Sequence, residues 1–227
     1  MQNIGKKAQF HVPVKQSTET VSVEPEVVGT TAGVKKKAFK RTELDEDMYL
    51  QPEEIQALFD VIEKRKDRAV LRIVYHHGLR AHEVGLLQMG DYQDRLELLY
   101  IRRGKGSISR QHRLIPEELK ALRGYIKFER GTMPGPLFPS RQGRAGMSRF
   151  TVWRMVHYYC DLAGIRIEKA HPHALKHSCG THLAERGNQP DAIQDWLGHR
   201  DSASTDIYMH FSKRRRDESV DKNSDWK

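Results

Sequence analysis

The chain has 227 residues, a formal net charge of +9 and a hydrophobic fraction of 37%, which leaves room for one sizeable domain or two small ones. No apolar run approaches the ~20 residues of a membrane helix, and the N-terminus lacks the apolar stretch of a signal peptide, so we expect neither a membrane nor an exported protein. The two cysteines, Cys160 and Cys179, make no disulfide framework and favour a reducing, cytoplasmic compartment.

The excess positive charge is concentrated at the two ends of the chain. Residues 1–41 carry a net charge of +5 and residues 213–227 carry +2, which leaves +2 for residues 42–212. Basic tails bind DNA through counterion release without reading its sequence. They also simply aid solubility, so charge alone does not decide for a nucleic-acid partner.

Residues 1–42 show no sustained helical or strand period and are expected to form a basic, mostly disordered arm. A helix is predicted from Pro52, since proline suits a first helical position. Asp67 is expected to cap a second helix that Gly78 ends. Short apolar segments at 96–102 and 112–115 predict two antiparallel strands around a turn, with a short helix over 81–88 before them.

Further helices are predicted over 116–130, 148–164, 172–185, 190–198 and 204–211, from proline or serine at their starts and glycine at several ends. The expected fold is therefore mainly α with a small antiparallel β-sheet (α+β). We expect the folded domain to span residues 43–212 and a charged tail to occupy 213–227.

Six polar residues stand in distinctive local frames. Arg80 follows Gly78-Leu79 and precedes Glu83, Lys105 lies between two glycines, and His199 follows Leu197-Gly198. The remaining three are His173 and Lys176, in His171-Pro172-His173-Ala174-Leu175-Lys176-His177, and Tyr208. Each alone has an ordinary structural interpretation, such as a core tyrosine or an exposed turn lysine. Their common order and spacing are what need explaining.

This set resembles the catalytic residues of the tyrosine recombinase (phage integrase) family. The likeness covers residues 50–211 and is strongest over 171–208. It implies that Tyr208 is a nucleophile that forms a 3′-phosphotyrosine link with DNA. Arg80 would bind the scissile phosphate, oriented by Glu83, and Lys105 would protonate the leaving 5′-oxygen.

The same resemblance makes His173 a general base or phosphate donor and His199 a pocket residue that binds the phosphate. Fixed cations around the phosphate need no metal, so no cofactor is expected.

One position departs from the family pattern, which has His-x-x-Arg where this chain has His173 and Lys176. Lysine keeps the charge but loses the planar pair of donors. Two functions follow: an active recombinase whose cleavage is slowed by Lys176, or a DNA-binding regulator of the same fold that cuts weakly or not at all.

A third hypothesis is a metal-binding interaction protein, because histidines and a cysteine cluster over 171–182. Zinc would need three or four converging ligands, and the helical spacing offers few. We expect His171 to cap a helix instead and His177 to be a buried hydrogen-bonding residue.

The expected partner is double-stranded DNA, which a homo-tetramer would bind at paired sites. Accessory DNA-bending proteins are expected to assist it, and the expected location is the cytoplasmic nucleoid. Only about 42 residues precede the domain, so the chain resembles the short fimbrial phase-variation recombinases, which implies inversion or the integration and excision of a mobile element. The candidate DNA contacts are basic residues of the arm and of the strand region: Lys35, Lys36, Lys37, Lys40, Arg41, Arg102, Arg103 and Arg110.

Overall fold

The computed structural model describes residues 48–143 and 145–209. The expected basic arm, the charged tail and both domain boundaries, at 42 and 212, lie outside the described residues. No helix in the described part of the chain is long and apolar enough to cross a membrane.

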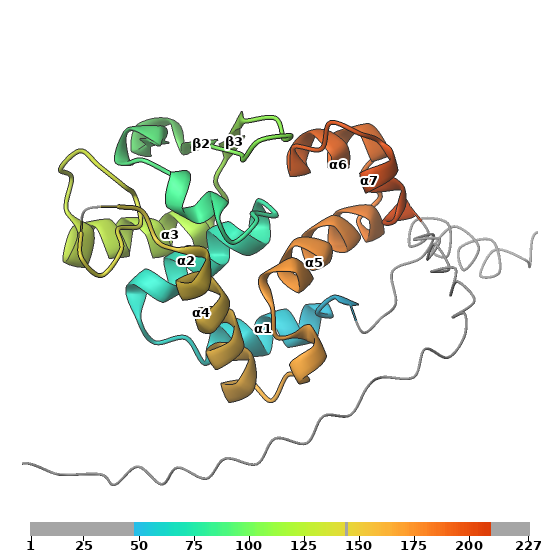
Figure 1. Ribbon diagram of the computed structural model, residues 1–227, viewed down its shortest axis with the longest axis horizontal. Coiled ribbons are helices and arrows are strands. Elements are labelled where there is room, and N and C mark those ends of the chain that lie inside the picture. The colour runs from blue at the N-terminus through green and yellow to red at the C-terminus, as the bar shows by residue number, and fades with distance from the viewer. Residues whose placement is uncertain (1–47, 144, 210–227) are drawn as a thin grey trace, which may run out of the picture. The chain divides into compact units, whose positions relative to one another are not determined.

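The described domain is mainly helical, with one small sheet, as the sequence predicts (Figure 1). Its helices are α1 (Pro52–Asp60), α2 (Arg65–His76), α3 (Pro116–Tyr125), α4 (Arg149–Leu162), α5 (Pro172–Glu185), α6 (Pro190–Leu197) and α7 (Ala203–Asp206). Its strands are β1 (Tyr92–Gln93), β2 (Leu98–Ile101) and β3 (Arg110–Arg113). Short 3₁₀ turns lie at Glu83–Leu86, Met89–Asp91, Asp94–Leu96 and Ile167–Lys169, and a π-helical turn at Ile126–Arg130 continues α3.

The starts of several helices follow directly from the sequence. Pro52, Pro116, Pro172 and Pro190 each occupy the first turn of a helix, where the missing N–H costs nothing. The Ser148 hydroxyl caps α4 by accepting a hydrogen bond from the Thr151 N–H at 3.2 Å.

The prediction for the start of α2 is wrong. The helix begins at Arg65, with Lys64 at its N-cap, so Asp67 lies in the first turn instead of capping it. Its negative charge still interacts favourably with the N-terminal end of the helix dipole. The carboxylate also accepts a hydrogen bond from the Tyr159 hydroxyl of α4 at 2.9 Å. A tertiary contact therefore uses the side chain that the local pattern assigned to a cap.

The sheet is antiparallel in the order β1-β2-β3, and Leu99 pairs with His112 at its centre. Both predicted strands exist, but β2 is shorter than expected and β3 begins two residues earlier, at Arg110. The helix predicted over 81–88 is only a 3₁₀ turn, Glu83–Leu86.

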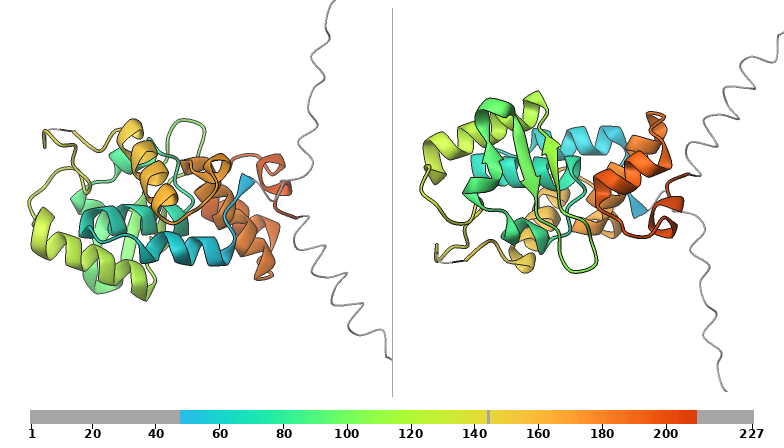
Figure 2. Two further views of the ribbon diagram at one scale, coloured as in Figure 1. Left: turned by 90° about the horizontal axis from the view of Figure 1, so that it is seen from below. Right: turned by 90° about the horizontal axis from the view of Figure 1, so that it is seen from above.

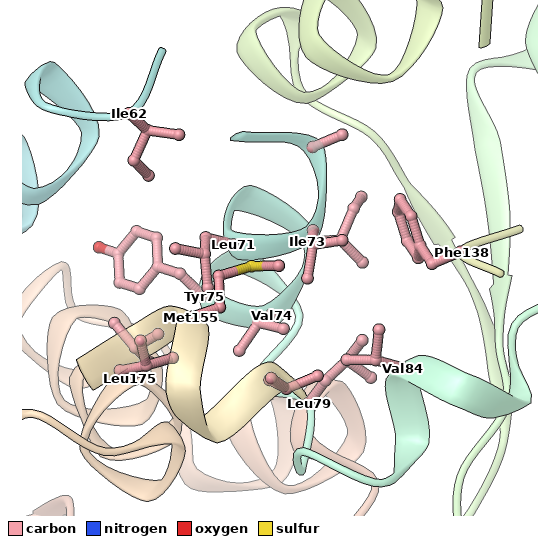
Figure 3. Close-up of a cluster of buried hydrophobic side chains, with 14 of the residues drawn as sticks. Ile62, Leu71, Ile73, Val74, Tyr75, Leu79, Val84, Phe138, Met155 and Leu175 are labelled. Carbon is pink, nitrogen blue, oxygen red and sulfur yellow. The ribbon is translucent and has the colours of Figure 1, made fainter. Parts of the chain in front are cut away.

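Two apolar clusters form the core. The larger one takes residues from α1 to α5 and from the sheet, and Figure 3 shows part of it around α2. The smaller one consists of Cys179, Ala184, Ile193, Leu197 and Tyr208. Helix α5 contributes to both clusters, and the two views of Figure 2 show α6 and α7 at the end of the domain opposite α3.

Candidate functional site

Arg80 lies on the connection after α2 and is held by two neighbours. Its backbone N–H donates to Glu83 Oε2 at 2.8 Å, and its Nη1 lies 3.3 Å from Glu83 Oε1. The same Nη1 donates to Ser107 Oγ at 2.6 Å, in the loop between β2 and β3. Glu83 thus orients Arg80, as expected, and leaves about a third of the side chain exposed at 32%.

The loop that carries Lys105 packs against the end of α6. Ile108 N–H donates to Gly198 O at 3.0 Å, and Ser107 pairs with His199 in an isolated antiparallel bridge. Gly198 has φ +67°, and a Cβ there would lie 2.7 Å from Ile108 O, so only glycine permits this close approach. Lys105 itself is exposed, and the docked loop places it beside the segment of His199.

Two predicted residues lie one helical turn apart at the start of α5. His173 is exposed, whereas Lys176 is only 5% exposed. The Lys176 ammonium donates to Gly78 O at 3.0 Å and to Leu197 O at 3.3 Å. Lys176 therefore links the segment before Arg80 to the segment before His199.

The Tyr208 side chain packs against α5 and is only 1% exposed. Its hydroxyl hydrogen-bonds to His177 Nδ1 at 3.2 Å, and its ring stacks on that of His199 with centroids 6.5 Å apart. A Cβ on Gly180 would lie 2.5 Å from Tyr208 Cζ. Glycine at position 180 is thus what lets the ring lie on the helix.

Burial strongly perturbs the pKa values of the ionisable groups of the site. Burial, with Arg103 and Arg80 adding repulsion, lowers the pKa of Lys176 to about 7. Burial and then Lys176 lower the pKa of His199 to about 3, so its imidazole is neutral at pH 7. Burial raises the pKa of Tyr208 well above its ordinary value, although Arg80 opposes this. The phenol is therefore protonated in the described conformation.

One candidate DNA contact is contradicted by the structure. The side chain of Arg103 is fully buried and paired with Glu83 at 3.1 Å, so it offers no charge to a DNA surface. Burial lowers the pKa of Arg103, while Glu83 opposes that shift. The run of basic residues in the sequence gave no sign that one member points inward from the end of β2.

The other candidate DNA contacts divide into two groups. Arg102 and Arg110 are about half exposed but are paired with Asp91 at 2.6 Å and Asp195 at 2.5 Å. They would exchange these carboxylates for phosphates on binding DNA. The arm residues lie outside the described residues: Lys35, Lys36, Lys37, Lys40 and Arg41.

The histidine-rich segment does not converge on a metal. No group of three potential ligands is found within residues 48–143 and 145–209. His171 Nδ1 accepts a hydrogen bond from the Ala174 N–H at 3.1 Å, as expected for a cap of α5. His182 contacts the Tyr75 hydroxyl at 2.8 Å, and His177, which is half-buried, contacts Tyr208.

Two contributors to the site, Ser107 and Thr205, were not predicted from the sequence, and a third, His177, was predicted without its partner. Ser107 binds Arg80, Thr205 Oγ1 lies 3.1 Å from His199 Nδ1, and His177 binds Tyr208. Serine and threonine carry little local signal because their hydroxyls serve many turns. His177 was noticed as a hydrogen-bonding residue, but its partner lies 31 residues away in the sequence.

Comparison with known proteins gives a consistent family. The pattern of the Phage integrase family matches residues 48–215. The chain is 35% identical over 155 residues to tyrosine recombinase XerD of Proteus mirabilis, covering 66% of this chain and 49% of that protein. It is 32% identical over 176 residues to tyrosine recombinase XerA of Pyrococcus furiosus, covering 76% and 60%.

Solved structures agree with these sequence relatives. The crystal structure of XerA recombinase superposes with a TM-score of 0.66 at 26% identity, covering 77% of this chain and 62% of that one. The post-cleavage complex of XerH site-specific recombinase with palindromic difH substrate gives 0.64 at 26%, covering 76% and 52%. The chain spans about half to three fifths of the length of these relatives. A family pattern that spans most of the chain, joined to a shared catalytic-domain fold, places the chain in the phage integrase family of tyrosine recombinases.

Proposed function

We propose that the protein is a site-specific DNA recombinase that cleaves and rejoins DNA through a 3′-phosphotyrosine intermediate. The observation that supports this is that four segments far apart in the sequence come together at one site. Arg80 binds the loop of Lys105, that loop packs on the segment of His199, and Tyr208 stacks on His199. Lys176 bonds to the backbone of two of these segments.

The proposed reaction is a phosphoryl transfer. The Tyr208 oxygen attacks the scissile phosphorus, the bond to the 5′-oxygen breaks, and its electron pair leaves on that oxygen. Lys105 donates a proton to the leaving oxygen, and His173 accepts the phenol proton as Tyr208 attacks. Arg80 and Lys176 offset the charge that develops on the non-bridging oxygens, and neutral His199 donates a hydrogen bond to them.

For its oxygen to attack the scissile phosphate, Tyr208 must leave its buried position. Its hydroxyl is bonded to His177, and its ring is buried between α5 and His199. We infer that DNA binding releases the ring, because a protonated and buried phenol is a poor nucleophile. The small cluster around Tyr208 has only five buried members, so few buried contacts oppose such a movement.

Covalent trapping tests the proposal. The protein is incubated with a nicked suicide duplex that carries the repeats flanking its own gene, and a slow-migrating protein–DNA adduct is sought on a denaturing gel. We expect an adduct with the native protein, none with Tyr208→Phe, and an unchanged amount with Tyr158→Phe, whose ring is 55% exposed. An adduct that persists in Tyr208→Phe would overturn the assignment of the nucleophile.

A DNA-binding regulator is the second candidate function, and one observation favours it. Lys176 is bonded to two carbonyls, and its pKa of about 7 leaves it partly neutral at neutral pH. A weaker cation stabilises the transition state less, by a margin of up to ~10²–10³ in rate. Binding to the same duplex in a native gel without any adduct would support the regulator.

The partners follow from the same proposal. Double-stranded DNA is the substrate, two sites are paired in a homo-tetramer with accessory DNA-bending proteins, and the product is an inversion or an integration or excision of a mobile element. XerH, a structural neighbour, is bound to its difH substrate in both pre-cleavage and post-cleavage complexes. Deleting residues 1–41 should weaken DNA binding if the arm contributes counterion release.

A further inference from the structure

The guanidinium of Arg103 is enclosed by main-chain oxygens below the candidate site. Its Nη2 donates to His77 O at 2.7 Å and to Trp196 O at 2.9 Å, and its Nη1 donates to Gly78 O at 3.0 Å. Glu83 Oε2 lies 3.1 Å from the same Nη1. A planar fork that reaches several acceptors at once is what arginine offers and lysine does not.

Lys176 approaches the same two chain segments from the other side, from α5. Its ammonium shares the Gly78 carbonyl with Arg103 and takes the Leu197 carbonyl, next to that of Trp196. The segment 77–78 leads directly into Arg80, and the segment 196–197 leads into His199. Two buried cations therefore fix the separation of these two parts of the site.

The charges around Lys176 favour a small cation there. Arg103 and Arg80 repel it, while Glu83 and Cys179 are the groups that favour its charged form. An arginine at position 176 would place a second guanidinium beside that of Arg103 at the Gly78 carbonyl. The residue at this position is buried, since Lys176 is only 5% exposed. Overfilling a closed space is destabilising even when the charge is conserved.

We propose that Arg103 is a positioning residue and that Arg103 and Lys176 act as one interdependent pair. The planar guanidinium of Arg103 binds the backbone carbonyls of Gly78 and Trp196 and fixes their positions. The compact Lys176 ammonium then keeps its third N–H for the scissile phosphate. The departure from His-x-x-Arg at Lys176 is thus compensated by Arg103 at the base of the Lys105 loop. The catalytic part of this inference rests on the proposed function.

A charge-conserving exchange tests the pair. Four proteins are compared: native, Arg103→Lys, Lys176→Arg, and the double exchange Arg103→Lys/Lys176→Arg. Arg103→Lys has no guanidinium at this position pair and Lys176→Arg has two. Each single variant should therefore lower the midpoint of thermal unfolding by about 4 °C or more. The double exchange restores one fork and one ammonium, and we expect it to recover at least half of the summed loss. Losses that simply add would overturn the interdependence.

A second measurement separates a charge effect from packing. The ¹³Cε resonance of Lys176 is titrated against pH in the native protein and in Arg103→Met. The repulsion by Arg103 is removed in the variant, so the pKa of Lys176 should rise from about 7 toward its ordinary value. The control is Arg113→Met, an arginine of β3 whose side chain is 79% exposed. An unchanged Lys176 titration in Arg103→Met would contradict the proposed coupling.

Adduct formation on the suicide duplex connects the pair to catalysis. Lys176→Arg alone should form adduct at least tenfold more slowly than the native protein, and the double exchange should recover part of that rate. A faster adduct from Lys176→Arg would overturn the inference. If no variant forms an adduct, the proposed function fails, while the unfolding and titration results still decide whether the two residues are coupled.

Discussion

The two apolar clusters of the domain differ in size and in what they hold. The larger cluster joins α1 to α5 with the sheet and contains no candidate catalytic residue, whereas the smaller one has five buried members and includes Tyr208. The domain also contains a set of buried polar residues, here called the polar seam: His77, Glu83, Arg103, His112 and Lys176. The candidate nucleophile is therefore held by a few contacts that can open without unfolding the main core.

The largest expected effect is a loss of global stability when a side chain of the larger cluster is truncated, in contrast to a local effect in the smaller cluster. Leu71 of α2 is fully buried in the main core, so Leu71→Ala should lower the free energy of unfolding by about 2–5 kcal/mol. Ile193→Ala in the small cluster should mainly raise local opening of α6. Urea denaturation measures the first effect and amide hydrogen exchange the second. Equal exchange rates throughout the domain in Ile193→Ala would contradict two separable clusters.

Acid should open the polar seam and its surroundings first. Burial lowers the pKa of His76 to about 4 and that of His112 to about 3, and burial also lowers that of His182 to about 4. Unfolded histidines bind protons near pH 6.5, so the unfolded state takes up more protons below that pH. Stability is therefore full above pH 6.5 and is lost as pH falls toward 4, by about 2 kcal/mol for each of the three histidines near pH 5.

Urea denaturation at pH 7, 6 and 5 checks this acid effect. The matched variant is His112→Gln, which removes one of these three histidines, the one that belongs to the polar seam. Its stability should depend less steeply on pH than that of the native protein. A slope identical to the native one would show that His112 does not contribute.

The packing of Tyr208 is tested by Gly180→Ala. The added Cβ would overlap the Tyr208 ring, so the ring should be displaced at a cost of about 1–3 kcal/mol. Modification by tetranitromethane, located by peptide mass spectrometry, should rise at Tyr208. Gly124→Ala in α3 is the control, because no atom lies within 4 Å of a Cβ there; it should leave Tyr208 protected. Protection of Tyr208 in Gly180→Ala would refute the stowed arrangement.

The smallest expected effect concerns the contact between Arg80 and the Lys105 loop. Ser107→Ala removes the acceptor 2.6 Å from Arg80 Nη1, which should cost about 1 kcal/mol, or about fivefold in adduct formation. Single-turnover trapping measures the rate, with the thermal midpoint as a check that the fold is kept. A rate equal to that of the native protein would mean that Arg80 is positioned by Glu83 alone.

Much of the fold was predictable because it is encoded locally. Proline in the first turn of a helix and glycine after its end act within a few residues, and the starts of α1, α3, α5 and α6 followed from them. Asp67 shows the limit, since a local pattern could not know that Tyr159, 92 residues away, would claim its carboxylate.

The candidate site was predictable as a set of residues but not as an arrangement. Six residues in matching order indicated the family, and the fold and relatives confirm that family. Their roles stay predictions. The stowing of Tyr208 on Gly180 and the use of both Arg103 and Lys176 on Gly78 O could not be read from the chain.

Most of the helices, two of the three strands and the family could therefore be predicted from the sequence, because periodicity, caps and motif order act along the chain. Which charges face outward depends on the tertiary packing. Arg102 and Arg103 are adjacent in sequence, yet one is exposed beside Asp91 and the other is buried against Glu83. Successive side chains leave an extended backbone on opposite sides, and only the packing of the carbonyls at His77, Gly78 and Trp196 gave the inward one its partners.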